Sequence, residues 1–160
     1  MKAVVQRVLD ASVTVEGTCC GRIGRGLLVY LGVARGDTER DAEKLAGKIA
    51  DLRIFEDGEG KMNLSIGDLP DGDLPDGDPA GPLGILAVSQ FTLLADARKG
   101  RRPYYGNAAD SGEAKHLYEY FMLKIRSRGL RCEEGVFQAH MAVRYTNDGP
   151  VTIILDSREL

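Results

Sequence analysis

The chain has 160 residues, of which 43% are hydrophobic and 28% are charged. A chain of this length forms about one domain with its own core, which excludes a disulfide-stabilised miniprotein and a large multidomain protein. No apolar run approaches the roughly 18 residues of a membrane-spanning helix, and the first residues lack the continuous apolar stretch of a secretory signal. We therefore expect a cytoplasmic protein that does not enter a membrane.

The net charge of −3 depends on one short stretch. Five aspartates lie in an Asp-, Pro- and Gly-rich segment at about 67–82, and without them 19 of the 24 acidic residues remain against 21 basic ones. The rest of the chain is nearly neutral and carries local basic clusters, which can contact phosphates. The segment contains DLPDG twice, too rich in turn-forming residues for a helix or strand. We expect a surface insertion within one domain spanning 1–160.

Cysteine and histidine residues form no metal-binding or disulfide pattern. The number of cysteines is odd, and none are spaced as C-x-x-C: Cys19, Cys20 and Cys132. His116 and His140 lack a spacing that would direct two ligands to one ion. We expect reduced thiols, no metal and no cofactor.

The first third of the chain predicts two strands and a helix. Residues 2–16 are rich in β-branched side chains and predict a strand that bends near Asp10. The apolar run at 27–33 is bounded by glycines and predicts a buried strand. Apolar positions then recur at helical spacing, so we expect an amphipathic helix of about four turns capped by Asp37 or Thr38.

The remaining elements alternate in type. Residues 53–66 predict a strand, a hairpin and a short strand, and 84–93 predict a central strand. A second amphipathic helix is expected over 111–128, and 136–155 return to β patterning with an interruption at 147–150. This order predicts an α+β domain with a mostly antiparallel sheet and two main amphipathic helices, rather than a doubly wound sheet.

Two polar segments carry residues that could perform chemistry. Ser89-Gln90-Phe91-Thr92 ends the predicted central strand. A hydroxyl can act as a nucleophile or position a water, and a glutamine amide can donate to a carbonyl oxygen. No histidine or lysine base accompanies these residues in the sequence, and the hydroxyls could instead close local backbone hydrogen bonds.

The second segment is Asn147-Asp148-Gly149-Pro150. Proline cannot donate to a β ladder, so a Gly-Pro step marks a turn or a cis bond. One interpretation is a simple hairpin turn. The other is a rigid pair of backbone carbonyls that project into a pocket and reject a substituent by steric exclusion.

The chain resembles the D-aminoacyl-tRNA deacylase family at several segments. They are MKAVVQRV at 1–8, with ASVTV after it at 11–15, then SQFTL at 89–93, FQAHM at 137–141 and NDGPVT at 147–152. The resemblance covers essentially the whole chain outside 67–82. The Ser-Gln-Phe-Thr segment at 89–92 and the Gly-Pro-Val-Thr segment at 149–152 together, in this order, are highly specific to the family.

The resemblance implies a barrel-like α+β fold and a homodimeric cytoplasmic hydrolase with its active site at the subunit interface. The substrate would be the ester that links a D-amino acid, or glycine, to the 3′ adenosine of tRNA. In the family the Gly-Pro step is cis and enters the partner's pocket, where its carbonyls exclude an L side chain. Gly149 and Pro150 would form this chiral filter here, and Arg7 would brace it.

Other site residues follow from the same resemblance. Catalytic roles fall on Ser89, Gln90 and Thr92, Phe91 would lie near the adenine, and the pocket would include Phe137, Ala139 and Met141. Backbone amides of the SQFT segment would polarise the ester carbonyl while the RNA 2′-hydroxyl assists water, because no base for Thr92 is evident. Gln138 stands where the family commonly has glycine.

Basic residues after the pocket strand give a further expectation and an alternative. Lys99, Arg101 and Arg102 are expected to contact tRNA phosphates. The alternative is a non-catalytic module for RNA or DNA ends, with Tyr104-Tyr105 as a stacking platform. A structural dimer in which the Gly-Pro step is only a turn is a third interpretation.

Overall fold

The computed structural model describes residues 1–70 and 81–160. Eight strands, two α-helices and three short 3-10 helices follow one another along the described chain: β1 (Lys2–Val15), β2 (Thr18–Ile23), β3 (Gly26–Gly32), α1 (Glu39–Ala50), β4 (Phe55–Glu56), β5 (Met62–Leu64), η1 (Ile66–Asp68), β6 (Gly84–Ser89), η2 (Phe91–Leu94), α2 (Ser111–Arg126), β7 (Cys132–Glu134), β8 (Ala142–Asp156) and η3 (Ser157–Glu159).

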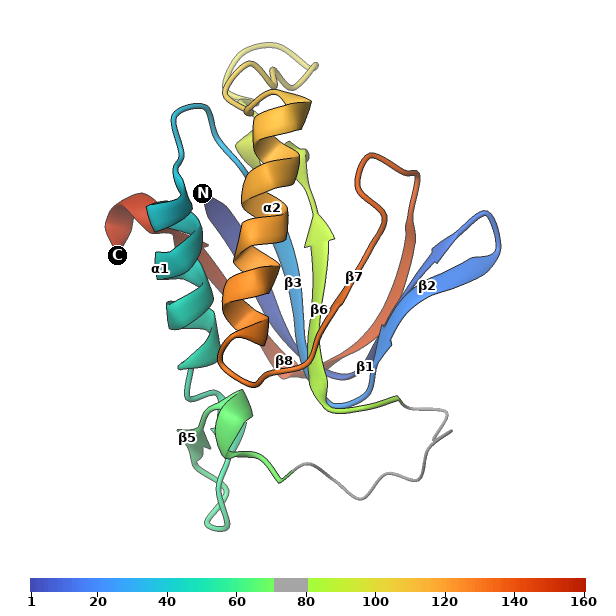
Figure 1. The fold of residues 1–160 in the computed structure, drawn as a ribbon, viewed down its shortest axis with the longest axis vertical. Helices are drawn as coiled ribbons and strands as arrows, with labels where there is room; N and C mark the ends of the chain where they lie inside the picture. The colour runs from blue at the N-terminus through green and yellow to red at the C-terminus, as the bar shows by residue number, and fades with distance from the viewer. Residues whose placement is uncertain (71–80) are drawn as a thin grey trace.

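The main sheet has six strands in the order β2-β1-β3-β6-β7, with β8 paired to β1 (Figure 1). β1 runs antiparallel to β2, β3 and β8, whereas β3–β6 and β6–β7 are parallel pairs. The β1–β8 register shifts between Gln6 and Asp10, and the sheet curls into a nearly closed, barrel-like form. The predicted α+β class with mostly antiparallel strands is confirmed.

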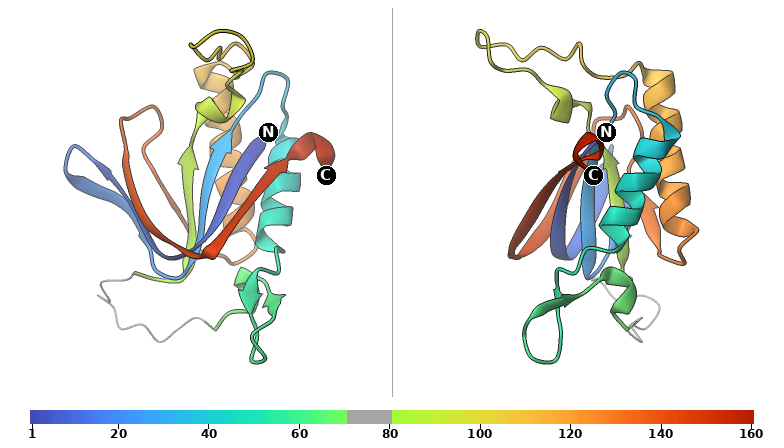
Figure 2. Two further views of the ribbon diagram at one scale, coloured as in Figure 1. Left: turned by 180° about the vertical axis from the view of Figure 1, so that it is seen from behind. Right: turned by 90° about the vertical axis from the view of Figure 1, so that its left-hand side faces the viewer.

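Both helices lie side by side on one face of the sheet (Figure 2). Their apolar sides meet a large core that includes Leu45, Phe121 and Ile85, and a second cluster with Leu86 and Val88 fills the curl of the sheet. β6 is therefore buried on both faces, and successive side chains enter different cores because a strand alternates its faces. This explains why its sequence is continuously apolar rather than alternating.

The helix boundaries agree closely with the sequence predictions. Thr38 is the N-cap of α1, and the carboxylate of Asp41 accepts from the Thr38 backbone N at 2.9 Å. Asp110 caps α2 by accepting from the backbone N of Gly112 and Glu113, each at 3.0 Å. α2 ends at Arg126, two residues before the predicted limit.

Several β predictions were wrong. β2 and β7 were not predicted, because short strands with exposed polar positions leave no clear alternation. The predicted strand over 84–93 ends at Ser89, and Val136-Phe137 lie outside any strand. β8 runs unbroken through 147–150, because β1 continues to pair with it on either side of the register shift.

The predicted insertion at 67–82 is ordered at both ends that the structure describes. Asp68 accepts from the backbone N of Ser65 at 2.8 Å, and Leu69 is buried. The carbonyl of Pro82 accepts from the Gly24 backbone N at 2.8 Å. The prediction for 71–80 lies outside the described residues.

Candidate active site at the end of β6

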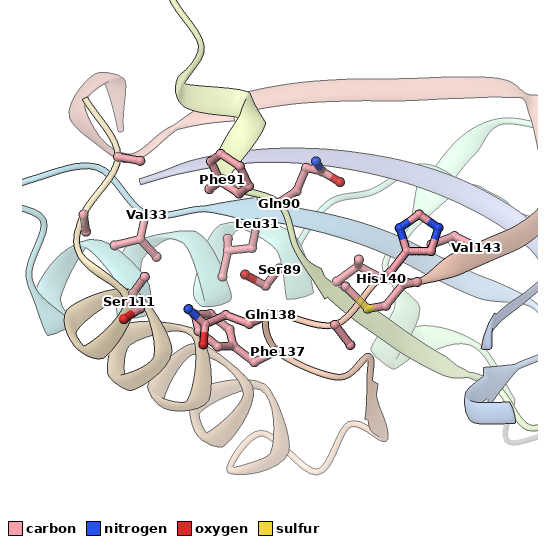
Figure 3. A pocket seen from close by; sticks show the side chains of 16 residues that line it. Leu31, Val33, Ser89, Gln90, Phe91, Ser111, Phe137, Gln138, His140 and Val143 are labelled. Carbon is pink, nitrogen blue, oxygen red and sulfur yellow. The ribbon is translucent and has the colours of Figure 1, made fainter. Parts of the chain in front are cut away.

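A cavity of about 490 Å³ opens where β6 ends, between the sheet and the first turns of α2 (Figure 3). Its walls come from β3, β6, η2, α2 and the turn before β8. The lining residues are Leu31, Val33, Val88, Ser89, Gln90, Phe91, Ala108, Ala109, Ser111, Ala114, Phe137, Gln138, Ala139, His140, Met141 and Val143. A concave, mainly apolar site with a few polar groups is typical of a small-ligand pocket.

The chain changes direction at Gln90, and this exposes two backbone amides. The Gln90 N–H still donates to the Leu31 carbonyl at 2.8 Å, but Phe91 starts the 3-10 helix η2. The first N–H groups of a helix have no partner within it. Within the described chain, neither the Phe91 nor the Thr92 amide donates a hydrogen bond to another group. Both remain available to an incoming oxygen.

Thr92 is placed differently from the rest of its segment. Ser89, Gln90 and Phe91 line the cavity, whereas Thr92 does not. Its hydroxyl oxygen accepts a hydrogen bond from the Gln90 side-chain amide. An amide donor cannot remove the hydroxyl proton, so this contact does not activate Thr92 as a nucleophile.

The turn before β8 supplies Phe137, Ala139 and Met141 to the cavity wall, as expected. Phe137 packs on Tyr118 of α2 with ring centroids 6.0 Å apart. The Tyr118 hydroxyl donates to the Ala87 carbonyl at 2.8 Å, and burial raises the pKa of this tyrosine. A Cβ added at Gly135 would lie 2.6 Å from the Met141 sulfur, so only glycine lets that side chain take its place.

Gln138 occupies a position that favours glycine. Its φ is 63°, and the Ala139 N–H donates to the Val136 carbonyl at 3.2 Å, which closes a β-turn with Gln138 third in it. A positive φ at this position of a turn is the reason for a glycine preference. The Gln138 side chain lines the cavity beside α2, where Ser111 also lies (Figure 3).

Sequence reasoning missed Ser111 and His140 as lining residues. His140 is the one titratable side chain of the wall formed by described residues, and the Thr92 hydroxyl is hydrogen-bonded to the Gln90 amide rather than to this imidazole. The position of His140, two residues before the start of β8 and between the predicted pocket residues Ala139 and Met141, could have indicated it. Ser111 at the first position of α2 carried no sequence signal beyond helix capping.

An aromatic pair stands at the cavity. Phe91 is 56% exposed, and its ring meets Tyr105 edge to face with centroids 5.1 Å apart. Tyr104 points away into solvent at 65% exposure, and its backbone pairs with Asp96. These residues lie on the loop between η2 and α2, seen at the top of Figure 1.

Lys99, Arg101 and Arg102 occupy the same loop and are exposed, but they do not line the cavity. Their contact with tRNA phosphates stays a prediction.

Gly149 and Pro150 lie away from this chain's cavity and are exposed. Their peptide bond is cis, and Gly149 has φ 115°. A Cβ on Gly149 would lie 2.8 Å from Val151 Cγ2 and 3.1 Å from Arg7 Nη2, so a side chain does not fit there.

Arg7 fastens this segment to the body of the protein. It is 5% exposed, its Nη1 donates to the Ile54 carbonyl at 2.6 Å, and its Nε lies 2.9 Å from Asp148 Oδ2. Nε is not aligned for a hydrogen bond, so the second contact is an ion pair. The Asn147 amide adds hydrogen bonds to the carbonyls of Arg7 and Val151 at 2.9 and 3.0 Å.

The described residues contain no group of three or more His, Cys, Asp or Glu side chains placed to hold a metal ion. None of the helices in that part of the chain is both long and apolar enough to cross a membrane.

Comparison with known proteins places the chain in a family. The family model for D-Tyr-tRNA(Tyr) deacylase matches residues 4–156. The chain is 57% identical to the D-aminoacyl-tRNA deacylase of Koribacter versatilis over 159 residues, 99% of each protein. It is 51% identical to the D-aminoacyl-tRNA deacylase of Thermotoga petrophila, over 100% of this chain and 99% of that protein.

Two examples come from the similar solved structures. One is the c-Myc DNA Unwinding Element Binding Protein, with 41% identity, a TM-score of 0.84 and 98% of both chains covered. A probable eukaryotic D-amino acid tRNA deacylase shares the fold at 20% identity, with a TM-score of 0.76 over 97% of this chain and 98% of that one. The protein belongs to the D-Tyr-tRNA(Tyr) deacylase family.

Proposed function

We propose that this protein hydrolyses the ester between a D-amino acid, or glycine, and the 3′ adenosine of tRNA, as a chiral proofreading enzyme of the cytoplasm. Family membership supports the substrate class. The observation that carries the proposal is the cavity of about 490 Å³ at the end of β6, which Phe91 lines where η2 begins with the unpartnered amides of Phe91 and Thr92.

The chemistry follows from those amides. An ester carbonyl oxygen that accepts from both N–H groups is polarised, and the charge that develops on it during attack by water is stabilised there. The 2′-hydroxyl of the terminal ribose assists the water, so the protein needs no base beside Thr92. The adenine stacks on the aromatic rings of Phe91 and Tyr105.

Selection for D-amino acids falls to Gly149 and Pro150 of a second subunit. In one chain these residues are exposed and outside its own cavity, so the filter acts only when a partner copy inserts it. The contacts from Arg7 and Asn147 hold the segment in one conformation. A segment that rejects a side chain by steric exclusion must be rigid in this way. Exposed apolar side chains on β1 and β8 are available to such a partner copy: Leu9, Tyr145 and Ile154.

Hydrolysis of matched D- and L-tyrosyl-tRNA in the presence of EDTA tests the proposal. We expect rapid release of tyrosine from the D form, at least about 100-fold faster than from the L form, because an excluded side chain prevents the ester from reaching the amides. Equal rates for both forms would contradict the proposed filter. Release of tyrosine from neither form would contradict the proposed function.

The Thr92→Ala variant separates the two mechanisms in the same assay. If the backbone amides polarise the ester, this variant keeps kcat within about tenfold of the wild type. A loss of about 10⁴-fold or more would instead make the Thr92 hydroxyl the nucleophile.

A nucleic-acid-end binding module is the second candidate. The Phe91–Tyr105 pair and the similar structure named for binding a DNA element favour it. It predicts that RNA is retained on a filter without turnover of either ester.

A further inference from the structure

A second cavity, of about 520 Å³, shares the wall formed by η2 with the first. Four cationic side chains line it, against one carboxylate: Lys2, Arg35, Arg98 and Arg158 face Asp96. We call it the basic cleft.

The cations of the basic cleft come from four separate parts of the chain. Lys2 begins β1, Arg35 follows β3, Arg98 follows η2, and Arg158 belongs to η3. The start of β1 and η3 lie together at the end of the molecule that also carries η2 (Figure 2). A run of basic residues along one segment is an ordinary solvated surface, whereas this cluster exists only because the fold brings distant segments together.

Contacts within the chain use part of this charge. Asp96 Oδ2 accepts from Arg98 at 2.5 Å, and the Arg98 hydrogen bonds lower the pKa of Asp96 to about 2. These two charges therefore offset each other. Arg158 Nη2 lies 3.5 Å from Asp37, whose carboxylate also pairs with the Met1 α-amino group at 2.8 Å.

Two cations remain with no carboxylate contact. Arg35 donates a hydrogen bond from its Nε to the Ala108 carbonyl, at 3.3 Å. Lys2 is exposed and forms no ion pair with another described residue. The basic cleft thus keeps a net positive charge at neutral pH.

The basic cleft lies next to the first cavity. Phe91 at one end of η2 lines the first cavity, and Leu94 at the other end lines the basic cleft. Two neighbouring residues of the loop before α2 divide in the same way. Ala108 lines the first cavity, and Asn107 lines the basic cleft. One short helix therefore separates the two cavities.

We propose that the basic cleft binds a phosphodiester of the single-stranded RNA 3′ end whose terminal adenosine occupies the first cavity. The inference rests on the proposed function and adds a second point of attachment for the same substrate. Guanidinium groups match phosphate oxygens with paired N–H donors, and an ammonium adds a point charge. This site is distinct from the loop residues Lys99, Arg101 and Arg102, none of which lines the cleft.

Binding of an uncharged RNA hairpin with a single-stranded 3′ ACCA end tests the site without requiring turnover. The variant Lys2→Gln/Arg158→Gln removes two cations that contact neither Phe91 nor Ala108. We expect its affinity to fall about tenfold at low salt. The slope of log affinity against log salt should fall by about 1.4 if each cation neutralises one phosphate of a single strand.

The matched control is Lys48→Gln/Lys115→Gln, which makes the same charge change on α1 and α2 outside the basic cleft. Its salt slope should equal that of the wild type. An equal loss of affinity in both double variants, or in neither, would overturn the proposal.

Hydrolysis is then compared between D-tyrosyl-tRNA and 3′-D-tyrosyl-adenosine, which lacks the preceding phosphates. The ratio of kcat/KM on tRNA to that on the adenosine ester should fall about tenfold in Lys2→Gln/Arg158→Gln, through KM. If the wild type hydrolyses neither ester while the RNA-binding difference persists, the proposed function fails and the basic cleft stands. An unchanged ratio together with unchanged binding removes the cleft alone.

Discussion

Gln138 is the residue at which the backbone and the side chain have opposite requirements. Its φ of 63° favours glycine, and the left-handed region costs a residue with a Cβ about 1–2 kcal/mol. The chain nevertheless places a carboxamide there, on the wall of the cavity. Strained residues concentrate at functional sites, so we expect the glutamine to serve the pocket rather than the turn.

The Gln138→Gly variant should raise the free energy of unfolding by up to about 1 kcal/mol, because relief of the left-handed conformation exceeds the added entropy of the unfolded chain. Urea denaturation measures this. Glu16→Gly is a matched control, since Glu16 also has a positive φ, 49°, in the turn before β2 and far from the cavity walls. A loss of stability in Gln138→Gly alone would contradict the assignment of strain.

At the scale of elements, the start of α1 is tied to the end of the chain. The carboxylate of Asp41 accepts from Thr38 Oγ1 at 2.8 Å and from Ser157 Oγ at 2.9 Å. Ser157 in η3 is fully buried. Burial by itself raises the pKa of Asp41, and the hydrogen bonds from Thr38 and Ser157 outweigh it and lower the pKa to about 2.

This junction gives a pH-dependent prediction. A carboxyl whose folded pKa is about 2, against 3.8 as its ordinary value, stabilises the fold above about pH 4 and loses that effect as the pH falls toward 2. Asp41→Asn should therefore lower the unfolding free energy by about 1 kcal/mol at pH 7, as loss of a helix cap does. The difference from wild type should shrink at pH 2.5.

Urea unfolding at both pH values provides the measurement. Glu119→Gln, on the exposed side of α2, serves as control because an exposed carboxylate contributes little. The same destabilisation of Asp41→Asn at pH 7 and pH 2.5 would show that the carboxylate charge is not what stabilises the junction.

At the scale of the whole molecule, the Gly-Pro segment and the cavity of one chain are separate. The proposed filter therefore depends on the number of subunits. One chain presents the cavity at the end of β6 and the Gly149-Pro150 segment in the middle of β8, and the two do not meet. In the symmetric dimer that the proposed function requires, this arrangement occurs twice, and the proposal predicts that each site takes one part from each chain.

Subunit mixing tests this arrangement. Gly149→Ala disturbs the filter, and Ala114→Phe fills the cavity from α2, so each variant alone should lose D-selective hydrolysis. After subunit exchange at equal amounts, half of the dimers are mixed and each mixed dimer has one intact site. About a quarter of the wild-type activity should return.

Circular dichroism of each variant before mixing verifies that both fold. No recovery, despite demonstrated exchange, would mean that the Gly-Pro segment acts on the cavity of its own chain.

Regular elements with strong side-chain periodicity were predictable. α1 and α2 bury one side, which leaves a helical spacing of apolar residues, and β3 lies within a continuous apolar run. Their limits depend on nearby caps such as Asp110. The short strands β2 and β7 were not predictable, because their pairing partners and not their own residues make them strands.

By itself, the sequence determined the α+β class, the two helices and the residues of the SQFT and Gly-Pro segments, because burial periodicity and residue type are local properties. Only the tertiary structure decided that β6 gives way to a 3-10 helix with two unpartnered amides, that Gln138 has a positive φ, and that the Gly-Pro segment lies outside its own chain's cavity. It also decided where the cations of the basic cleft meet. These features depend on contacts between segments far apart in the chain, which no local pattern records.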